Sequence, residues 1–122
     1  IYLFNSTAAW IYDGRIDFYL DTVNKAKDFW GSSLLDKHPD VIKSGKTKIN
    51  LRCMDISRLL KLYSKNDFII LKMDIEGAEF DIILHLLQTK VLDLIDYMAI
   101  EYHKDLNPYK LSIDLFNSIL QL

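Results

Sequence analysis

Cysteine is almost absent from this sequence of 122 residues, in which Cys53 is the single example. One thiol cannot form an internal disulfide, and the histidines at 38, 85 and 103 do not form a zinc-binding pattern with it. This usage is typical of a reducing compartment. We therefore expect a cytoplasmic protein.

An excess of one charge is also lacking, because 15 basic residues face 17 acidic ones and the formal net charge is -2. Such a chain has no general positive field to attract nucleic acid or an anionic membrane. Long apolar runs are missing too, since Lys72, Asp74 and His85 interrupt the richest stretches. None approaches the roughly 20 residues needed to span a bilayer. We expect neither nucleic acid nor a membrane among the partners.

The remaining composition is that of a folded chain, with 50% hydrophobic and 26% charged residues. Its length fits one small domain. The sequence starts at Ile1 without a methionine, and residues 1–4 resemble the interior of a strand and not a signal peptide. We expect the natural domain to begin upstream of this point.

A β-hairpin is predicted near the N-terminus. Apolar and polar residues alternate between Trp10 and Leu20 on both sides of Asp13-Gly14. Asp and Gly tolerate the positive φ angles that a two-residue type I′ turn requires. Residues 21–46 show no clean period and are expected to form a long loop.

Alternating strands and helices are predicted for the second part of the chain. The expected elements are a strand at 49–53, a helix at 56–63 capped by Asp55, a strand at 68–73 buried on both faces, a helix after Gly77 with an apolar stripe of Phe80, Ile83, Leu84 and Leu87, a strand at 97–102 and a helix at 112–122. This order indicates βαβ units, a parallel sheet and the α/β class. Ligands of such sheets bind at the carboxyl ends of the strands.

Three carboxylates, Asp74, Glu76 and Glu79, lie where the buried strand at 68–73 gives way to a helix. The free N–H groups of a helix start stabilise carboxylates, which can act as metal ligands, hydrogen-bond acceptors or bases. Alternatively, Asp74 caps the helix and the two glutamates occupy its first turn. The strand end favours a functional Asp74 and a structural Glu79, with Glu76 between them.

A second polar group, Glu101 and His103, follows the next predicted strand. These residues would lie beside Asp74 if the two strands are neighbours. Acid–base chemistry or polar contacts with a substrate are then expected. The alternative is a solvated His103 and a Glu101 paired with Lys72 or Lys104.

Other residues of chemical interest carry weaker signals. His85 is expected to form a solvated pair with Asp81. No role is predicted for His38. Cys53 is interpreted as an apolar filler, and Trp30 as a core or lid aromatic.

Residues 71–79, Leu-Lys-Met-Asp-Ile-Glu-Gly-Ala-Glu, resemble the Lys-x-Asp-x-Glu-Gly-Ala-Glu signature of FkbM-like methyltransferases. The order of other segments is similar as well, namely 5–10 with the Asp13-Gly14 turn and Phe18-Tyr19, then 31–34, the Asp55 helix, the signature and 100–103. The resemblance covers nearly the whole chain. It implies a Rossmann-like fold, a mainly parallel sheet with flanking helices, and methyl transfer from S-adenosylmethionine to a hydroxyl of a small molecule or sugar.

The resemblance also implies site residues by position. Asp74 would be catalytic and face the methyl donor or the acceptor hydroxyl, and Glu76, Glu101 and His103 would border the acceptor pocket. The adenine side of the cofactor would be lined by Asn5, Ala8, Ala9 and Trp10. The first strand, its Gly-rich loop, the ribose-binding acid and the final strands of the family are not found, so residues 1–122 are expected to be a partial domain, truncated at both ends.

Two other interpretations stay open. In the first, the chain is a non-catalytic Rossmann-like remnant that serves binding or assembly. Alternatively, Asp74 and Glu76 bind a divalent metal in a hydrolase or glycosyltransferase, because hard cations favour paired carboxylates. That third interpretation does not account for the predicted hairpin or for Ser32-Ser33. The sequence makes no prediction of the acceptor, the metal or the oligomeric state.

Overall fold

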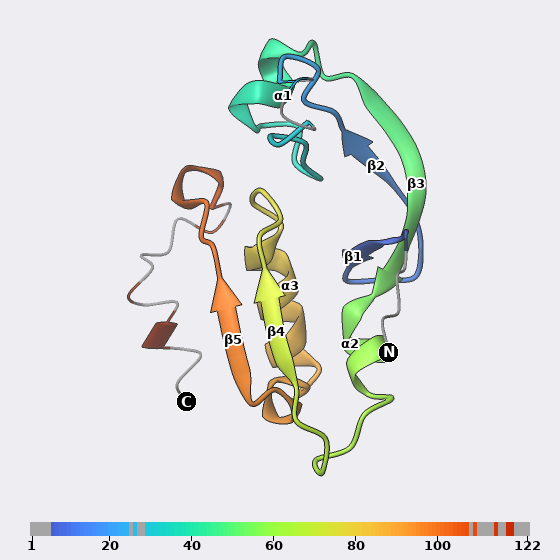
Figure 1. Ribbon diagram of the computed structural model, residues 1–122, viewed down its shortest axis with the longest axis vertical. Helices are drawn as coiled ribbons and strands as arrows, with labels where there is room; N and C mark the ends of the chain where they lie inside the picture. The colour runs from blue at the N-terminus through green and yellow to red at the C-terminus, as the bar shows by residue number, and fades with distance from the viewer. Residues whose placement is uncertain are drawn as a thin grey trace.

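Two small sheets and several short helices make up the described part of the chain, shown in Figure 1. The computed structural model describes residues 6–24, 26, 29–107, 109, 114, 117 and 118. The first sheet contains β1 (Ala8–Trp10), β2 (Gly14–Tyr19) and β3 (Lys48–Asp55) in the order β1-β3-β2. The second contains β4 (Ile70–Met73) and β5 (Tyr97–Ile100). The described part of the chain is therefore a mixed α/β structure.

The predicted hairpin is wrong, because β3 lies between β1 and β2. β1 runs parallel to β3, with Ala8 opposite Cys53, whereas β2 runs antiparallel to it, with Tyr19 opposite Lys48. Asp13 does not form the tight turn of a hairpin but makes contacts with residues distant in sequence. Its carboxylate accepts hydrogen bonds from the Asp55 backbone N–H at 3.2 Å and from the Arg58 guanidinium at 2.8 Å. Residues 11–13 therefore cross the end of β3, and β2 pairs with β3 instead of with β1.

The predicted loop between β2 and β3 is largely irregular, as expected, but it is held by specific hydrogen bonds. Ser33 pairs with Tyr19 through two backbone hydrogen bonds of 2.8 and 2.9 Å. A short helix, α1 (Pro39–Lys43), begins after His38, whose ring accepts a hydrogen bond from the Asp40 N–H. The loop is thereby attached to β2 as a defined structure.

From β3 to β5 the described residues follow the predicted alternation of strands and helices. α2 (Ile56–Leu60) starts at Asp55, whose side chain accepts hydrogen bonds from the N–H groups of Ser57 and Arg58, so the predicted cap is confirmed. β4, α3 (Glu79–Gln88) and β5 form a βαβ unit in which Ile70 lies opposite Tyr97 and the strands are parallel. Short 3-10 helices precede and follow β5 at Leu92–Leu94 and Lys104–Leu106.

The core is built around α3. Its fully buried apolar residues are Phe80, Ile82, Ile83 and Leu86, and they pack with Leu60, Met73 and Val91. The predicted stripe is partly wrong, since Leu87 is 38% exposed while Leu86 is buried. The buried face of the helix instead includes Glu79, Ile82 and Leu86.

The strand expected at 68–73 to be buried on both faces is confirmed as a strand but not in its burial. Burial alternates along β4, and Ile70 is 64% exposed whereas Met73 is 5% exposed. Phe68, just before the strand, is 75% exposed. In the described structure α3 covers one face of β4, and Figure 1 shows it behind the strand.

Several expectations concern residues outside those described. They are the strand at 1–4, the cofactor contact of Asn5 and most of the helix at 112–122. Within the described residues, the helices are all too short or too polar to cross a bilayer.

Candidate functional site

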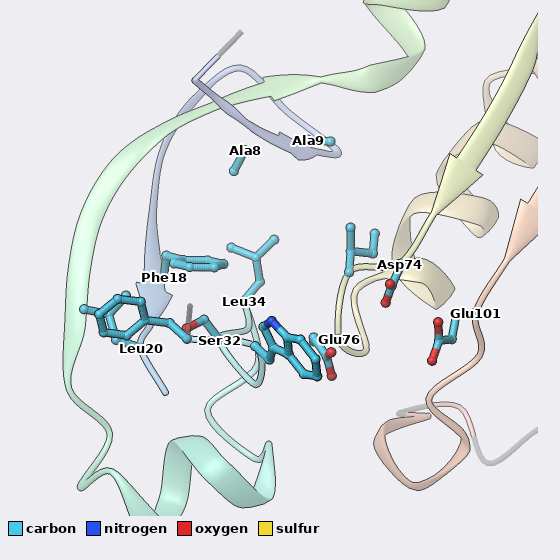
Figure 2. Close-up of a pocket in the computed structure, with 12 residues that line it drawn as sticks. Ala8, Ala9, Phe18, Leu20, Ser32, Leu34, Asp74, Glu76 and Glu101 are labelled. Carbon is cyan, nitrogen blue, oxygen red and sulfur yellow. The ribbon is translucent and has the colours of Figure 1, made fainter. Parts of the chain in front are cut away.

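A cleft of about 820 Å³ lies between the two sheets. Five of the predicted site residues line it, namely Ala8, Ala9, Asp74, Glu76 and Glu101. Figure 2 shows the two alanines on one side and the carboxylates of Asp74 and Glu101 on the other. The other lining residues are mostly apolar: Phe18, Leu20, Phe29, Trp30, Ser32, Leu34 and Ile75.

Asp74 and Glu101 are neighbours because β4 and β5 are parallel and in register. Met73 lies opposite Ile100, and the Glu101 N–H donates to the Met73 carbonyl at 3.0 Å. The next residue of each strand therefore leaves the sheet at the same edge, as expected for a ligand site of an open sheet. Asp74 is exposed and Ala78 is the residue before α3, so Asp74 does not cap this helix.

The turn that follows Asp74 is tightly constrained. Glu76 has a φ of +52° and Gly77 a φ of +103°. A Cβ atom at Gly77 would lie 2.7 Å from the Leu35 side chain and 2.9 Å from Leu106. The Ser33 hydroxyl donates a hydrogen bond of 2.6 Å to the Glu76 carbonyl. The positive φ and the close approach of the Leu35 and Leu106 side chains explain the glycine.

Glu79 is fully buried and holds the turn through hydrogen bonds. Its carboxylate accepts hydrogen bonds from the Gly77 N–H at 2.8 Å, from the His103 N–H at 2.8 Å and from His103 Nδ1 at 3.0 Å. These contacts fit the structural role expected of Glu79.

His103 lies between two carboxylates. Its Nε2 atom is 3.2 Å from Glu76 Oε2, while Nδ1 faces Glu79. Burial acts to lower the pKa of His103, but the hydrogen bond to Glu79 and the charges of Glu76, Glu79 and Glu101 outweigh it and raise the pKa above 6.5. With a side chain only 20% exposed, His103 is not the solvated residue of the alternative interpretation.

His38 is a site neighbour for which the sequence predicted no role. Its Nε2 atom lies 3.1 Å from Glu76 Oε2, and its Nδ1 accepts the Asp40 N–H. A ring that accepts at Nδ1 carries its proton on Nε2, so His38 donates to Glu76. The available signal was the His-Pro-Asp sequence, in which proline at a first helical position marks His38 as the cap.

Trp10 and His85 differ from their predicted positions. Trp10 packs against the core cluster and is not among the residues that line the cleft. His85 Nε2 lies 2.8 Å from Asp55 Oδ1, so its expected pairing with Asp81 is wrong. Asp81 instead accepts a hydrogen bond from the Tyr109 hydroxyl, which raises the pKa of Tyr109 to about 12.

These observations define an α/β structure in which a mostly apolar cleft carries three carboxylates at the carboxyl ends of two parallel strands. A comparison with protein-family models matches residues 7–121 to the methyltransferase FkbM domain. The chain therefore belongs to the FkbM methyltransferase family, and the resemblance found in the sequence is confirmed. Comparisons with curated proteins and with solved structures gave no significant match.

Proposed function

We propose that this methyltransferase domain uses S-adenosylmethionine and methylates a hydroxyl oxygen of a small molecule or sugar. One observation carries the proposal: Asp74 and Glu101, from the ends of adjacent parallel strands, face the same cleft as Ala8 and Ala9 of β1. In a Rossmann-like arrangement this edge is where cofactor and acceptor meet.

The cleft suits the proposed cofactor in size and chemistry. Pockets for small ligands have volumes of roughly 300–1,000 Å³ and are mainly apolar with a few placed polar groups. Carboxylates and aromatic faces both favour a cationic ligand, and Asp74, Glu101, Phe18 and Trp30 line this cleft. Bound S-adenosylmethionine supplies an electrophilic methyl group.

We assign the wall of the adenine to Ala8 and Ala9, whose small side chains leave room for a planar ring. Trp10 supports this wall from the core and does not contact the cofactor in our proposal, because it packs against the core cluster. Asn5, which we also assign to the cofactor, lies outside the described residues.

Asp74 is our candidate for the proton acceptor. Its exposed carboxylate can accept a hydrogen bond from the acceptor hydroxyl and receive the proton that this hydroxyl loses. Glu101 lies beside it and can bind a second polar group of the acceptor. Glu76 is held by His38 and His103, so we assign it to positioning the acceptor.

The test uses the protein that carries this chain, with radiolabelled S-adenosylmethionine and a panel of hydroxyl-bearing small molecules and sugars. General-base catalysis contributes about 10²- to 10⁴-fold, so Asp74→Asn should lose at least about 10² in turnover. Asp93→Asn, at an exposed position before β5, should retain it.

Calorimetry separates the two parts of the proposal. Asp93→Asn should bind S-adenosylmethionine like the wild type, and Asp74→Asn should retain measurable binding although it removes one carboxylate from the cleft. Full turnover by Asp74→Asn would refute its role as proton acceptor, and a wild-type protein without measurable cofactor binding would refute the cofactor.

A further inference from the structure

Three potential metal ligands converge at the edge of the cleft. One donor atom each of Asp74, Glu76 and His103 lies within 4.8 Å of the others. The residues come from the end of β4, the strained turn after it and the segment that follows β5. The parallel pairing of β4 with β5 thus brings together donors from two segments that are distant in sequence.

The surroundings orient these donors. The buried carboxylate of Glu79 accepts a hydrogen bond from His103 Nδ1, which leaves Nε2 as the atom directed toward Glu76. A carboxylate or carbonyl bound to the second ring nitrogen is the usual partner of a histidine that ligates metal. On the other side, His38 donates to Glu76 Oε2 and fixes that carboxylate. Both ligand side chains are thus held in place by partners that are not ligands themselves.

We propose that Asp74, Glu76 and His103 bind one divalent transition-metal ion, with Glu79 and His38 as orienting residues. Two carboxylates and one imidazole give a mixed oxygen and nitrogen set. Imidazole favours Zn²⁺ and its first-row neighbours, while Mg²⁺ prefers oxygen ligands alone. The site therefore selects an ion of the Zn²⁺ and Co²⁺ type.

The geometry requires a small adjustment. Bonds from Zn²⁺ to oxygen and nitrogen are about 2.0–2.2 Å long, so ligand atoms around one ion lie within roughly 4.4 Å of one another. Asp74 is the exposed member of the set and can move inward by a side-chain rotation. The ion would take the place of the direct contact between Glu76 and His103, now 3.2 Å long.

Metal binding itself does not depend on methyl transfer. Its consequence for catalysis rests on the proposed function: an ion beside Asp74 would lower the pKa of a bound acceptor hydroxyl and so assist its deprotonation. Binding and turnover are measured separately, which keeps a failure of one claim distinct from a failure of the other.

The deciding experiment titrates chelator-treated protein with Co²⁺, followed by visible absorption and by calorimetry in the absence of S-adenosylmethionine. The wild type should bind one equivalent, and Zn²⁺ should displace Co²⁺. Asp74→Asn and His103→Gln should each weaken binding by more than about tenfold. Matched controls are Asp93→Asn and His85→Gln, which change an exposed aspartate and a carboxylate-bound histidine outside the cluster.

Each outcome decides the proposal. Absence of Co²⁺ binding by the wild type, or unchanged affinity in Asp74→Asn, would overturn it. Displacement of Co²⁺ by an equal concentration of Mg²⁺ would overturn the assigned class of ion. Circular dichroism reports whether His103→Gln folds. If it does not, Asp74→Asn decides alone, because its exposed side chain has no part in the core.

Discussion

The Nε2 atom of His85 lies 2.8 Å from Oδ1 of Asp55, which joins α3 to the junction of β3 and α2. The same Asp55 oxygen accepts the N–H groups of Ser57 and Arg58. One carboxylate therefore connects the first sheet, the short helix and the central helix of the core.

Replacing this carboxylate should weaken the whole molecule. Asp55→Ala removes a helix cap and the partner of His85, so we expect a loss of about 1–3 kcal/mol in the free energy of unfolding. Urea denaturation followed by circular dichroism measures it. The control Asp93→Ala, at an exposed position, should change stability by less than about 0.5 kcal/mol. Equal effects of the two variants would contradict this role of Asp55.

The effect of Asp55 should depend on pH. Burial opposes ionisation, but the hydrogen bonds from Ser57 and His85 prevail and hold the pKa of Asp55 below 3.8. A carboxyl group with a lowered folded-state pKa stabilises fully above its unfolded pKa and loses this contribution as the pH falls through the folded value. The stability difference between wild type and Asp55→Ala should thus be constant above about pH 5 and shrink below pH 3.8.

Gly77, in the turn beside the cleft, can be compared with Gly45, a glycine of similar backbone conformation in the loop before β3. Both have positive φ angles, +103° and +67°, but a Cβ atom at Gly77 would lie 2.7 Å from Leu35, whereas Gly45 has open space. Gly45→Ala should cost about 1 kcal/mol for backbone strain alone. Gly77→Ala adds overpacking of about 1–3 kcal/mol. Thermal denaturation should rank the variants in this order, and equal costs would show that Leu35 and Leu106 yield without penalty.

Asp21 should control the loop that forms one wall of the cleft. Its buried carboxylate accepts hydrogen bonds from the N–H groups of Val23, Asn24 and Gly31 and from the Asn24 amide. Burial acts to raise the pKa of Asp21, but these hydrogen bonds lower it overall. In Asp21→Asn one acceptor oxygen becomes a donor, which should cost about 1–3 kcal/mol.

Hydrogen exchange gives the local readout for this variant. The amide of Gly31 should exchange faster in Asp21→Asn than in the wild type. Asp36→Asn, which removes only an exposed ion pair with Lys46 in the same loop, should leave both stability and exchange nearly unchanged. Unaltered exchange at Gly31 in Asp21→Asn would show that the loop is held by other contacts.

Local patterns predicted the order of the strands and helices from β3 to β5. Two of these patterns each lie within one short segment: the helical spacing of Ile56, Leu59 and Leu60 after Asp55, and the apolar run before Asp74. The structure contains the corresponding capped helix and strand. The adjacency of Asp74 and Glu101 followed from parallel pairing of two strands joined by a helix. These features need no information from distant parts of the chain.

The first sheet and the surroundings of Glu76 were not predictable in the same way. Asp13-Gly14 is a hairpin signal, yet the pairing of both flanking strands with β3 and the contact of Asp13 with Arg58 prevail over it. His38 contacts Glu76 although the two residues are distant in sequence. Its function as a partner of Glu76 depends on the position of the whole loop, which no local period encodes.

The central position of β3 has a consequence for how the molecule folds. β1 and β2 bond to β3 and not to each other, through pairings such as Ala8 with Cys53 and Tyr19 with Lys48. Neither β1 nor β2 can therefore form its sheet until the long segment that separates it from β3 has been brought together. The entropic cost of closing such a long loop slows folding. The βαβ unit of β4, α3 and β5 has shorter connections, and we expect it to fold first and serve as the surface on which the first sheet assembles.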